Sequence, residues 1–280
     1  MTLSARHLAR PVRHLGRLAL GLVFAATLVP ASAAPAAAAD ALTLPQAEVQ
    51  LVRLLNERRL AAGLVPYRVD SRLTEIARER SADMASKGYF SHVQPDGRTA
   101  FDYIAERKIT WYGAGEVLAK NNYPTLADSA AVANTGWTNS PGHNAVVMST
   151  GYNYVGVGLA VDSAGKKLWT AVMLKGPDRS GARSAMKSVA PTGTSTSTSV
   201  NVSVVWSGWD VRLQVLTAGL ADFQLQRRVD GGSWQTVATG TAATSVVQAL
   251  ARGRLWEFRI RARDKAANYG AWSAPVGTRT

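Results

Sequence analysis

The residues most able to do chemistry in this chain of 280 residues are its histidines, because it holds four of them and no cysteine. The lack of cysteine excludes disulfides, thiolate metal sites, a cysteine nucleophile and a lipid anchor on a cysteine. A metal ion would therefore have to be bound by histidine, aspartate or glutamate. His7 and His14 lie in an N-terminal leader, so His92 and His143 are the two candidates.

Three kinds of site can be built around two histidines. Two neutral imidazoles and one carboxylate can hold zinc with a fourth position open for water, although hydrolysis also needs a general base that is not itself a ligand. A serine beside a histidine base can act as a nucleophile. Ser91 and Ser140 precede the two histidines, but neither lies in a Gly-x-Ser-x-Gly elbow. In the third kind of site, the imidazoles only hydrogen-bond a carboxylate and order a cleft.

The N-terminal leader has the three parts of a secretory signal peptide. Four arginines precede an apolar run of 12 residues, 18–29, and small residues then offer cleavage sites after Ala33 or Ala39. A membrane span needs about 20 residues, so this run is too short to be one. Cleavage after Ala39 would remove the four arginines and lower the net charge from +13 to +9. We therefore predict a signal peptide at residues 1–39, a secreted extracellular protein and no transmembrane segment in the mature chain.

The mature chain begins with helical periodicity and then changes to strand periodicity. Apolar positions recur at helical spacing between residues 44 and 88, and again at 126–138. Residues 154–161 and 167–174 are instead rich in branched and aromatic side chains and flank a turn, which is typical of a hairpin. Helices followed by antiparallel strands predict an α+β domain with an α-β-α layer arrangement, which we assign to residues 40–180.

The composition changes beyond this domain. Residues 181–198 are rich in Gly, Ser, Thr and Pro, and we predict a flexible linker there because such a stretch has few side chains for a core. After it, apolar residues alternate with polar ones in short runs that are separated by turns such as Asp230-Gly-Gly232. Residues 199–280 are therefore predicted to form a small all-β sandwich.

Five short motifs follow one another along the first domain. They are Asn56-Glu-Arg-Arg59-Leu-Ala-Ala-Gly63, Gly88-Tyr-Phe-Ser-His92, Gly115-Glu116, Trp137-Thr-Asn-Ser-Pro-Gly-His143 and Val155-Gly-Val-Gly158. In this order the motifs resemble those of the CAP superfamily, also called SCP. That superfamily joins cysteine-rich secretory proteins, antigen-five proteins and plant pathogenesis-related proteins, and it has a secreted bacterial branch. The resemblance covers roughly residues 44–175 and implies an α-β-α sandwich with a central cleft.

The cleft of this family gathers two histidines and two acidic residues. The resemblance implies that His92 and His143 are the histidines and that Glu116 is the first acid, whereas the second acid falls on Ser140. His92, His143 and Glu116 are thus the candidate ligands for a divalent metal such as zinc. Because lipid binding is associated with several relatives, a small apolar ligand is the other candidate.

The missing second carboxylate bears on catalysis. Ser140 cannot act as a general base, and if Glu116 takes that role, a metal keeps only two protein ligands. We therefore favour a secreted binding protein over an enzyme. The alternative is an extracellular hydrolase that acts through a metal-bound water or a serine.

The second module resembles a fibronectin type III domain over about residues 199–274. The matching segments are Val204-Val-Trp206, Phe223-Gln-Leu-Gln226, Asp230-Gly-Gly-Ser-Trp234 and Trp256-Glu-Phe-Arg-Ile-Arg-Ala-Arg-Asp264. Such a fold needs no disulfide, which suits a chain without cysteine. The resemblance implies a module that localises the protein at the cell surface.

This module is also the basic part of the mature chain. Residues 191–280 hold 10 basic and 5 acidic side chains, against 16 and 14 in residues 40–180. Strand alternation points four arginines to the outer face of the sheet: Arg228, Arg259, Arg261 and Arg263. They form either a solvated face or a patch for an anionic cell-surface polymer. No nucleic-acid motif is present, and Trp209, Trp234 and Trp272 are candidates for stacking on sugars.

Overall fold

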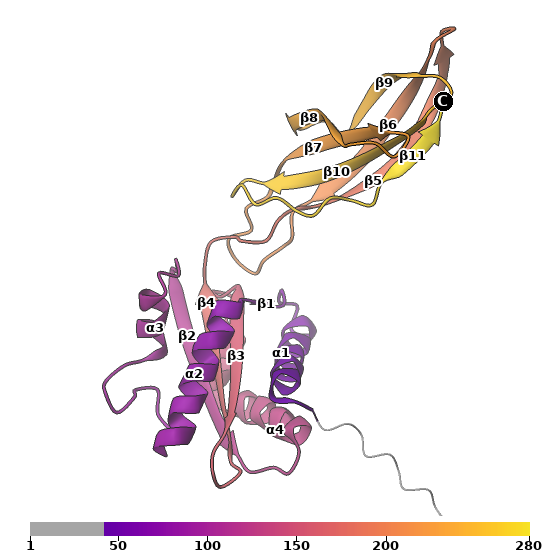
Figure 1. Cartoon of the computed structure of the whole chain (residues 1–280). Helices are drawn as coiled ribbons and strands as arrows, with labels where there is room; N and C mark the ends of the chain where they lie inside the picture. The colour runs from indigo at the N-terminus through magenta and orange to yellow at the C-terminus, as the bar shows by residue number, and fades with distance from the viewer. Residues whose placement is uncertain (1–41) are drawn as a thin grey trace, which may run out of the picture. The chain divides into compact units, whose positions relative to one another are not determined.

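The structure is a computed structural model that describes residues 42–280. The predicted signal peptide, residues 1–39, lies outside the described residues. Figure 1 shows helices around a sheet in the first half of the described chain and strands alone in the second half. The predicted fold class, an α+β domain followed by an all-β sandwich, is confirmed.

The sheet of the first domain has four strands in the order β1-β3-β4-β2. They are β1 (Arg68–Val69), β2 (Gly113–Asn121), β3 (Tyr154–Val161) and β4 (Lys167–Lys175). β4 pairs antiparallel with both β2 and β3, and β1 is parallel to β3. β3 and β4 form the predicted hairpin, whose turn is held by the Asp162 carboxylate as it accepts from the N–H groups of Ala164 and Lys166.

Helices pack on both faces of this sheet. They are α1 (Leu44–Ala61), α2 (Ser71–Lys87), α3 (Ala100–Glu106), α4 (Leu126–Asn139) and α5 (Pro141–Val147). α1 and α4 share a core with one face, in which Leu51, Trp137 and Trp169 are buried. α2 packs on the other face through Leu73 and Ile76, so the layers are α-β-α (Figure 1). Within residues 42–280, no helix combines the length and the apolar character that crossing a membrane requires.

Two glycines of β3 allow α2 to lie directly on the sheet. A Cβ atom added at Gly156 would lie 2.1 Å from backbone atoms of Leu73 and Thr74. One added at Gly158 would lie 2.1 Å from the backbone nitrogen of Arg78. Atoms cannot approach so closely, so any side chain at these positions would push the helix away from the sheet. The Val-Gly-Val-Gly motif therefore has a packing role.

We expect Gly156→Ala to lower the free energy of unfolding by about 3 kcal/mol, at the upper end of the usual cost of overpacking. The reason is that the clash is with backbone, which cannot rotate away as a side chain can. Urea denaturation of the chain measures this loss. Gly136→Ala in α4 is the matched control, because a Cβ there meets open space and alanine favours a helix over glycine by up to about 1 kcal/mol. Equal denaturation midpoints for the two variants would contradict the packing role.

The second domain consists of two antiparallel sheets with strand orders β5-β6-β9 and β11-β10-β7-β8. The strands are β5 (Arg183–Ser195), β6 (Ser199–Trp209), β7 (Leu220–Val229), β8 (Gln235–Thr241), β9 (Ser245–Ala251), β10 (Leu255–Asp264) and β11 (Val276–Arg279). Their inner faces bury one core, which includes Val202, Val204, Phe223, Phe258 and Ile260. This β-sandwich is consistent with a fibronectin type III-like domain.

The predicted linker at 181–198 is wrong for most of its length. Residues 183–195 form β5, which pairs antiparallel with β6. Ala182 and Val189 are buried in the sandwich core, and Met186 packs against it. β5 lies at the edge of its sheet, so most of its side chains face solvent and a strand rich in Ser, Thr and Pro is tolerated there. A flexible linker is therefore not the correct interpretation of this composition.

Candidate functional site

Glu116 lies in β2, and its side chain is only 4% exposed. α2 brings Arg80 to this carboxylate, and the loop between α2 and α3 brings His92. His92 Nδ1 lies 2.6 Å from Glu116 Oε2, and Arg80 Nε donates to Glu116 Oε1 over 3.2 Å. The structure thus joins two of the predicted site residues and adds an arginine to them.

The side chain of Arg80 is 0% exposed, and it also fixes the loop that carries His92. Its Nη2 donates to the carbonyl oxygens of Ser91 and His92 at 2.8 and 3.0 Å, and its Nη1 donates to the Tyr89 hydroxyl at 2.9 Å. Burial lowers the pKa of this guanidinium, but the charge of Glu116 and its hydrogen bond outweigh burial, and the pKa is raised. Sequence reasoning missed Arg80. The available signal was a charged residue at a helical position where the apolar spacing of α2 calls for a core side chain.

The imidazole of His92 borders a small cavity. The hydrogen bond with Glu116 raises the pKa of His92 and prevails over burial, which lowers it. Because Nδ1 is engaged, Nε2 is the ring nitrogen left for a ligand. The cavity has a volume of about 250 Å³ and is lined by His92, Thr99, Ala100, Phe101 and Glu116. Phe101 stacks on Trp111 with ring centroids 6.3 Å apart, so the aromatic residue that lines the cavity is itself backed by a second ring.

The other two predicted site residues do not join this hydrogen-bond network. His143 lies in α5, a helix that packs on β2 with Val146 against Gly115. Ser140 is the junction between α4 and α5, and its side chain makes no capping hydrogen bond. In the part of the chain that the structure describes, neither residue hydrogen-bonds to His92 or to Glu116.

A three-ligand metal site at His92, His143 and Glu116 is not assembled in this structure. Their ligand atoms do not all lie within 4.8 Å of one another; among residues 42–280 only a trio of aspartates meets that criterion. His92 and Glu116 are in contact, so His143 is the member whose ring nitrogens do not come close enough to both. In addition, one carboxylate oxygen of Glu116 is held by Arg80 and the other by His92. A divalent cation bound directly to Glu116 would also lie beside the buried positive charge of Arg80. These residues therefore fit a metal bound by imidazole nitrogens better than a metal bound by the Glu116 carboxylate. In the first arrangement, Glu116 would hydrogen-bond to His92 and would not contact the metal.

A second group of charged and aromatic side chains covers the outer face of β7 and β10. Two guanidinium carbons lie over each of three aromatic rings. Arg228 and Arg259 lie 4.6 and 4.3 Å from the centroid of the Trp234 ring, and Arg259 and Arg261 lie 4.5 and 4.7 Å from the centroid of the Trp272 ring. Arg261 and Arg263 lie 4.2 and 5.6 Å from the centroid of the Tyr269 ring. We call this series the arginine ladder: Arg228, Trp234, Arg259, Trp272, Arg261, Tyr269 and Arg263.

The arginines of the ladder differ in their countercharge. Arg228 and Arg263, at its ends, each form an ion pair with a carboxylate of the neighbouring strand. Arg259 and Arg261, in its middle, instead donate to neutral glutamine amide oxygens at 2.7 Å. Among the residues described, these two central guanidiniums have no carboxylate partner.

The ladder also bears on the expectation about sugars. The rings of Trp234 and Trp272 each have two guanidiniums over them, so both rings already contact arginines of the protein. Trp209 is 50% exposed and lies outside the ladder. Sugar stacking by these tryptophans stays a prediction.

The comparison with protein families agrees with the fold of the first domain. The CAP model, described as the cysteine-rich secretory protein family, matches residues 52–173. This segment contains β1 to β3, most of β4, α2 to α5 and the His92–Glu116 pair. The chain therefore contains a CAP domain of the cysteine-rich secretory protein family.

Individual relatives are similar over part of the chain. The uncharacterized protein YkwD of Bacillus subtilis is 33% identical over 147 residues, which is 50% of this chain and 54% of that protein. The uncharacterized membrane protein YlbC of the same organism is 33% identical over 112 residues, 40% of this chain and 31% of that protein. The chain thus spans about half the length of the first relative and about a third of the second. A solved structure of an extracellular protein containing a SCP domain, from Bacillus anthracis, is 27% identical over 48% of this chain and 44% of that chain, with a TM-score of 0.41.

Proposed function

We propose that this protein is a secreted binding protein whose ligand site is the cleft at His92 and Glu116. The observation that carries this proposal is that both oxygens of the buried Glu116 carboxylate are already bound. A buried carboxylate that accepts from protein donors on both oxygens is poorly placed to take a proton from water as a general base. It serves instead to fix the ring of His92, so that Nε2 is presented to a ligand.

A divalent metal such as zinc is the ligand that this arrangement favours. A histidine that binds a metal commonly has its other ring nitrogen hydrogen-bonded to a carboxylate, which orients the ring and raises its basicity. The His92–Glu116 contact has this form. His143, on the helix that packs against β2, would have to supply the second imidazole. Two protein ligands give a weaker site than the three or four of established zinc centres.

A small apolar ligand is the second candidate, and a separate observation favours it. The cavity beside His92 is walled by Ala100 and Phe101, and Phe101 and Trp111 each keep more than a third of their surface exposed. Binding sites for small molecules combine such apolar walls with a few polar groups. Here His92 would be the polar group.

The hydrolase alternative has less support from the geometry. A serine nucleophile needs a hydrogen bond to a base. In the described part of the chain, the Ser91 hydroxyl accepts from the N–H of Val93 and bonds to no histidine, and Ser140 bonds to none either. The cleft therefore lacks a paired nucleophile and base.

Isothermal titration with zinc tests the metal. We expect uptake at neutral pH, and we expect His92→Ala and His143→Ala each to remove most of it. Glu116→Gln should weaken it by about 10- to 100-fold, because the carboxylate acts through His92. Since the bond with Glu116 raises the pKa of His92, affinity should begin to fall above the ordinary histidine value of about 6.5 as the pH is lowered.

Ser140→Ala is the control for this titration, because Ser140 makes no contact with the pair, and it should change zinc affinity by less than about twofold. No zinc uptake by the unaltered protein at neutral pH would exclude the metal. The apolar ligand would then be tested with a fluorescent fatty acid, whose binding Phe101→Ala should weaken while Val49→Ala, a change of an exposed apolar residue on α1, should not.

One observation also favours a second function, attachment to an anionic polymer at the cell surface. Arg259 and Arg261 are held in place by the rings of Trp272 and of their neighbours, yet they have no carboxylate partner among the residues described. A linear polyanion would supply the missing negative charge. The β-sandwich would then hold the binding domain close to the cell surface.

A further inference from the structure

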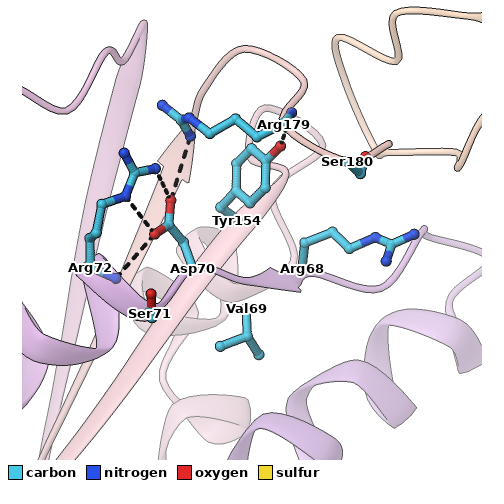
Figure 2. Close-up of a pocket in the computed structure, with 8 residues that line it drawn as sticks. All are labelled: Arg68, Val69, Asp70, Ser71, Arg72, Tyr154, Arg179 and Ser180. Carbon is cyan, nitrogen blue, oxygen red and sulfur yellow. Dashed lines mark hydrogen bonds and ion pairs between the residues drawn. The ribbon is translucent and has the colours of Figure 1, made fainter. Parts of the chain in front are cut away.

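A second cavity in the first domain is lined by arginines (Figure 2). It has a volume of about 310 Å³ and lies where β1 and the start of α2 meet the segment that follows β4. Arg68, Arg72 and Arg179 line it together with a single acidic residue, Asp70. Three guanidiniums around one carboxylate leave two positive charges in excess.

Asp70 and Arg72 neutralise each other. Arg72 donates from Nε and Nη2 to the Asp70 carboxylate at 2.9 and 2.6 Å, and the same carboxylate caps α2 by accepting from the backbone N–H of Arg72. Burial raises the pKa of Asp70, but the bonds and charge of Arg72 outweigh burial and hold this pKa below its usual value. The carboxylate is therefore ionised at neutral pH, and Arg72 is its closest countercharge.

Arg179 shares the same carboxylate at a longer distance, so three guanidiniums have one acidic partner. Its Nη2 donates to the carbonyl oxygen of Thr110 at 2.7 Å, whereas its Nη1 lies 3.5 Å from Asp70 Oδ2. Nη1 is one of only two buried side-chain nitrogen or oxygen atoms without a hydrogen-bond partner among residues 42–280. Burial and the nearby charge of Arg72 lower the pKa of this guanidinium. A buried donor without a partner points to a group that the protein itself does not supply.

Arg68 is the third guanidinium of this cavity. Figure 2 shows it on the side opposite to Arg72. Within the described residues its side chain makes neither an ion pair nor a hydrogen bond, and its backbone N–H is used in the sheet connection to Asn153. Nothing in the fold therefore requires a positive charge at this position.

We propose that this cavity binds a small phosphomonoester as its dianion. A phosphate group carries a charge of about −1.5 to −2 at pH 7, which matches the excess of two positive charges. Guanidinium groups are suited to phosphate because their planar array of donors can bind two oxygens at once. A volume of about 310 Å³ is within the range of small-molecule sites and admits a phosphate with a small organic group. The site is distinct from the His92–Glu116 cleft, so this proposal goes beyond the proposed function.

Isothermal titration of the full chain with inorganic phosphate at constant ionic strength tests this proposal. We expect a saturable site with a dissociation constant of about 1 mM or tighter. Arg179→Gln and Arg68→Gln should each weaken binding about tenfold, since each removes a charged donor. Dimethyl phosphate, which carries one negative charge, should bind at least about tenfold more weakly. Phosphate binding should also weaken as the pH is lowered from about 8 and the phosphate dianion gains a proton.

Arg53→Gln is the matched control, because Arg53 pairs with Glu57 on the exposed side of α1 and its loss removes the same charge elsewhere. It should change phosphate affinity by less than about twofold, as should Arg259→Gln combined with Arg261→Gln. Arg68→Gln keeps the test valid if Arg179→Gln fails to fold. The proposal is overturned by no phosphate uptake in the unaltered chain, by an equal loss in Arg53→Gln, or by dimethyl phosphate binding as tightly as phosphate. Each of these results leaves the zinc titration at His92 unaffected.

Discussion

Arg80→Met should lower the free energy of unfolding by about 3–5 kcal/mol, the usual cost of removing one partner from a buried ion pair. Methionine keeps most of the length of the side chain and removes its charge. Glu116, 4% exposed, would then be a buried carboxylate that keeps only its contact with His92. The loop at 89–92 would also lose three hydrogen bonds from the Arg80 guanidinium.

Urea denaturation measures this effect, and a double variant separates its two causes. Arg80→Met combined with Glu116→Leu removes both charges, so it should be more stable than Arg80→Met alone. Arg53→Met is the control, because the Arg53–Glu57 pair is more than half exposed and such pairs contribute about 0–1 kcal/mol. If Arg80→Met were no less stable than Arg53→Met, the central role of Arg80 in the cleft would be refuted.

The sequence predicts the first domain well because its elements have strong periods. The apolar spacing of α2 and the branched residues of β3 and β4 identify those elements directly. The prediction fails at β5, where the strand is at a sheet edge and needs few apolar residues. Pairing with β6 supplies its hydrogen bonds, and no local property of residues 183–195 reveals that partner. Composition thus misleads where a strand is stabilised mainly by its neighbour.

The cleft contains two residues that sequence motifs identify and one that only the fold identifies. His92 and Glu116 stand in motifs, and the structure brings them into contact. Arg80 stands in no motif, and its role depends on β2, which follows 33 residues after it at Gly113. What the sequence does show is a charge at a position that faces the core, and a buried charge requires a partner. A search of the fold for that partner leads to Glu116.

Strand alternation correctly predicts that Arg259 and Arg261 face outward, but it does not predict which residues they meet. Trp272 follows β10 in a loop, and its position over two arginines depends on the path of that loop. The ion pairs at the ends of the ladder likewise depend on the register between β7 and β10. The structure therefore reduces four equivalent candidate arginines to two that lack a countercharge.

Arg259→Gln combined with Arg261→Gln should weaken the binding of an anionic polymer about a hundredfold. Each central arginine offers charged hydrogen bonds that are typically worth about 1.5–3 kcal/mol, and neither has a carboxylate partner among residues 42–280. Binding to immobilised inorganic polyphosphate, measured with the full chain and with neutral dextran as the blank surface, gives this loss. For the unaltered chain, binding should weaken as salt rises and the screening length falls to about 8 Å at physiological ionic strength.

The control for this loss is Arg212→Gln combined with Arg252→Gln, which removes the same charge from two exposed positions outside the ladder. If only the net charge of the module mattered, the two double variants would bind equally weakly. If the ladder is the site, the control should retain binding to within about threefold, because distant charges are largely screened. Arg179→Gln should likewise leave polymer binding unchanged, which separates this surface from the phosphate cavity. Undiminished binding after the loss of Arg259 and Arg261 would contradict the polymer site. The ladder would then be a solvated face of the sheet, stabilised by the contacts between its rings and its guanidiniums.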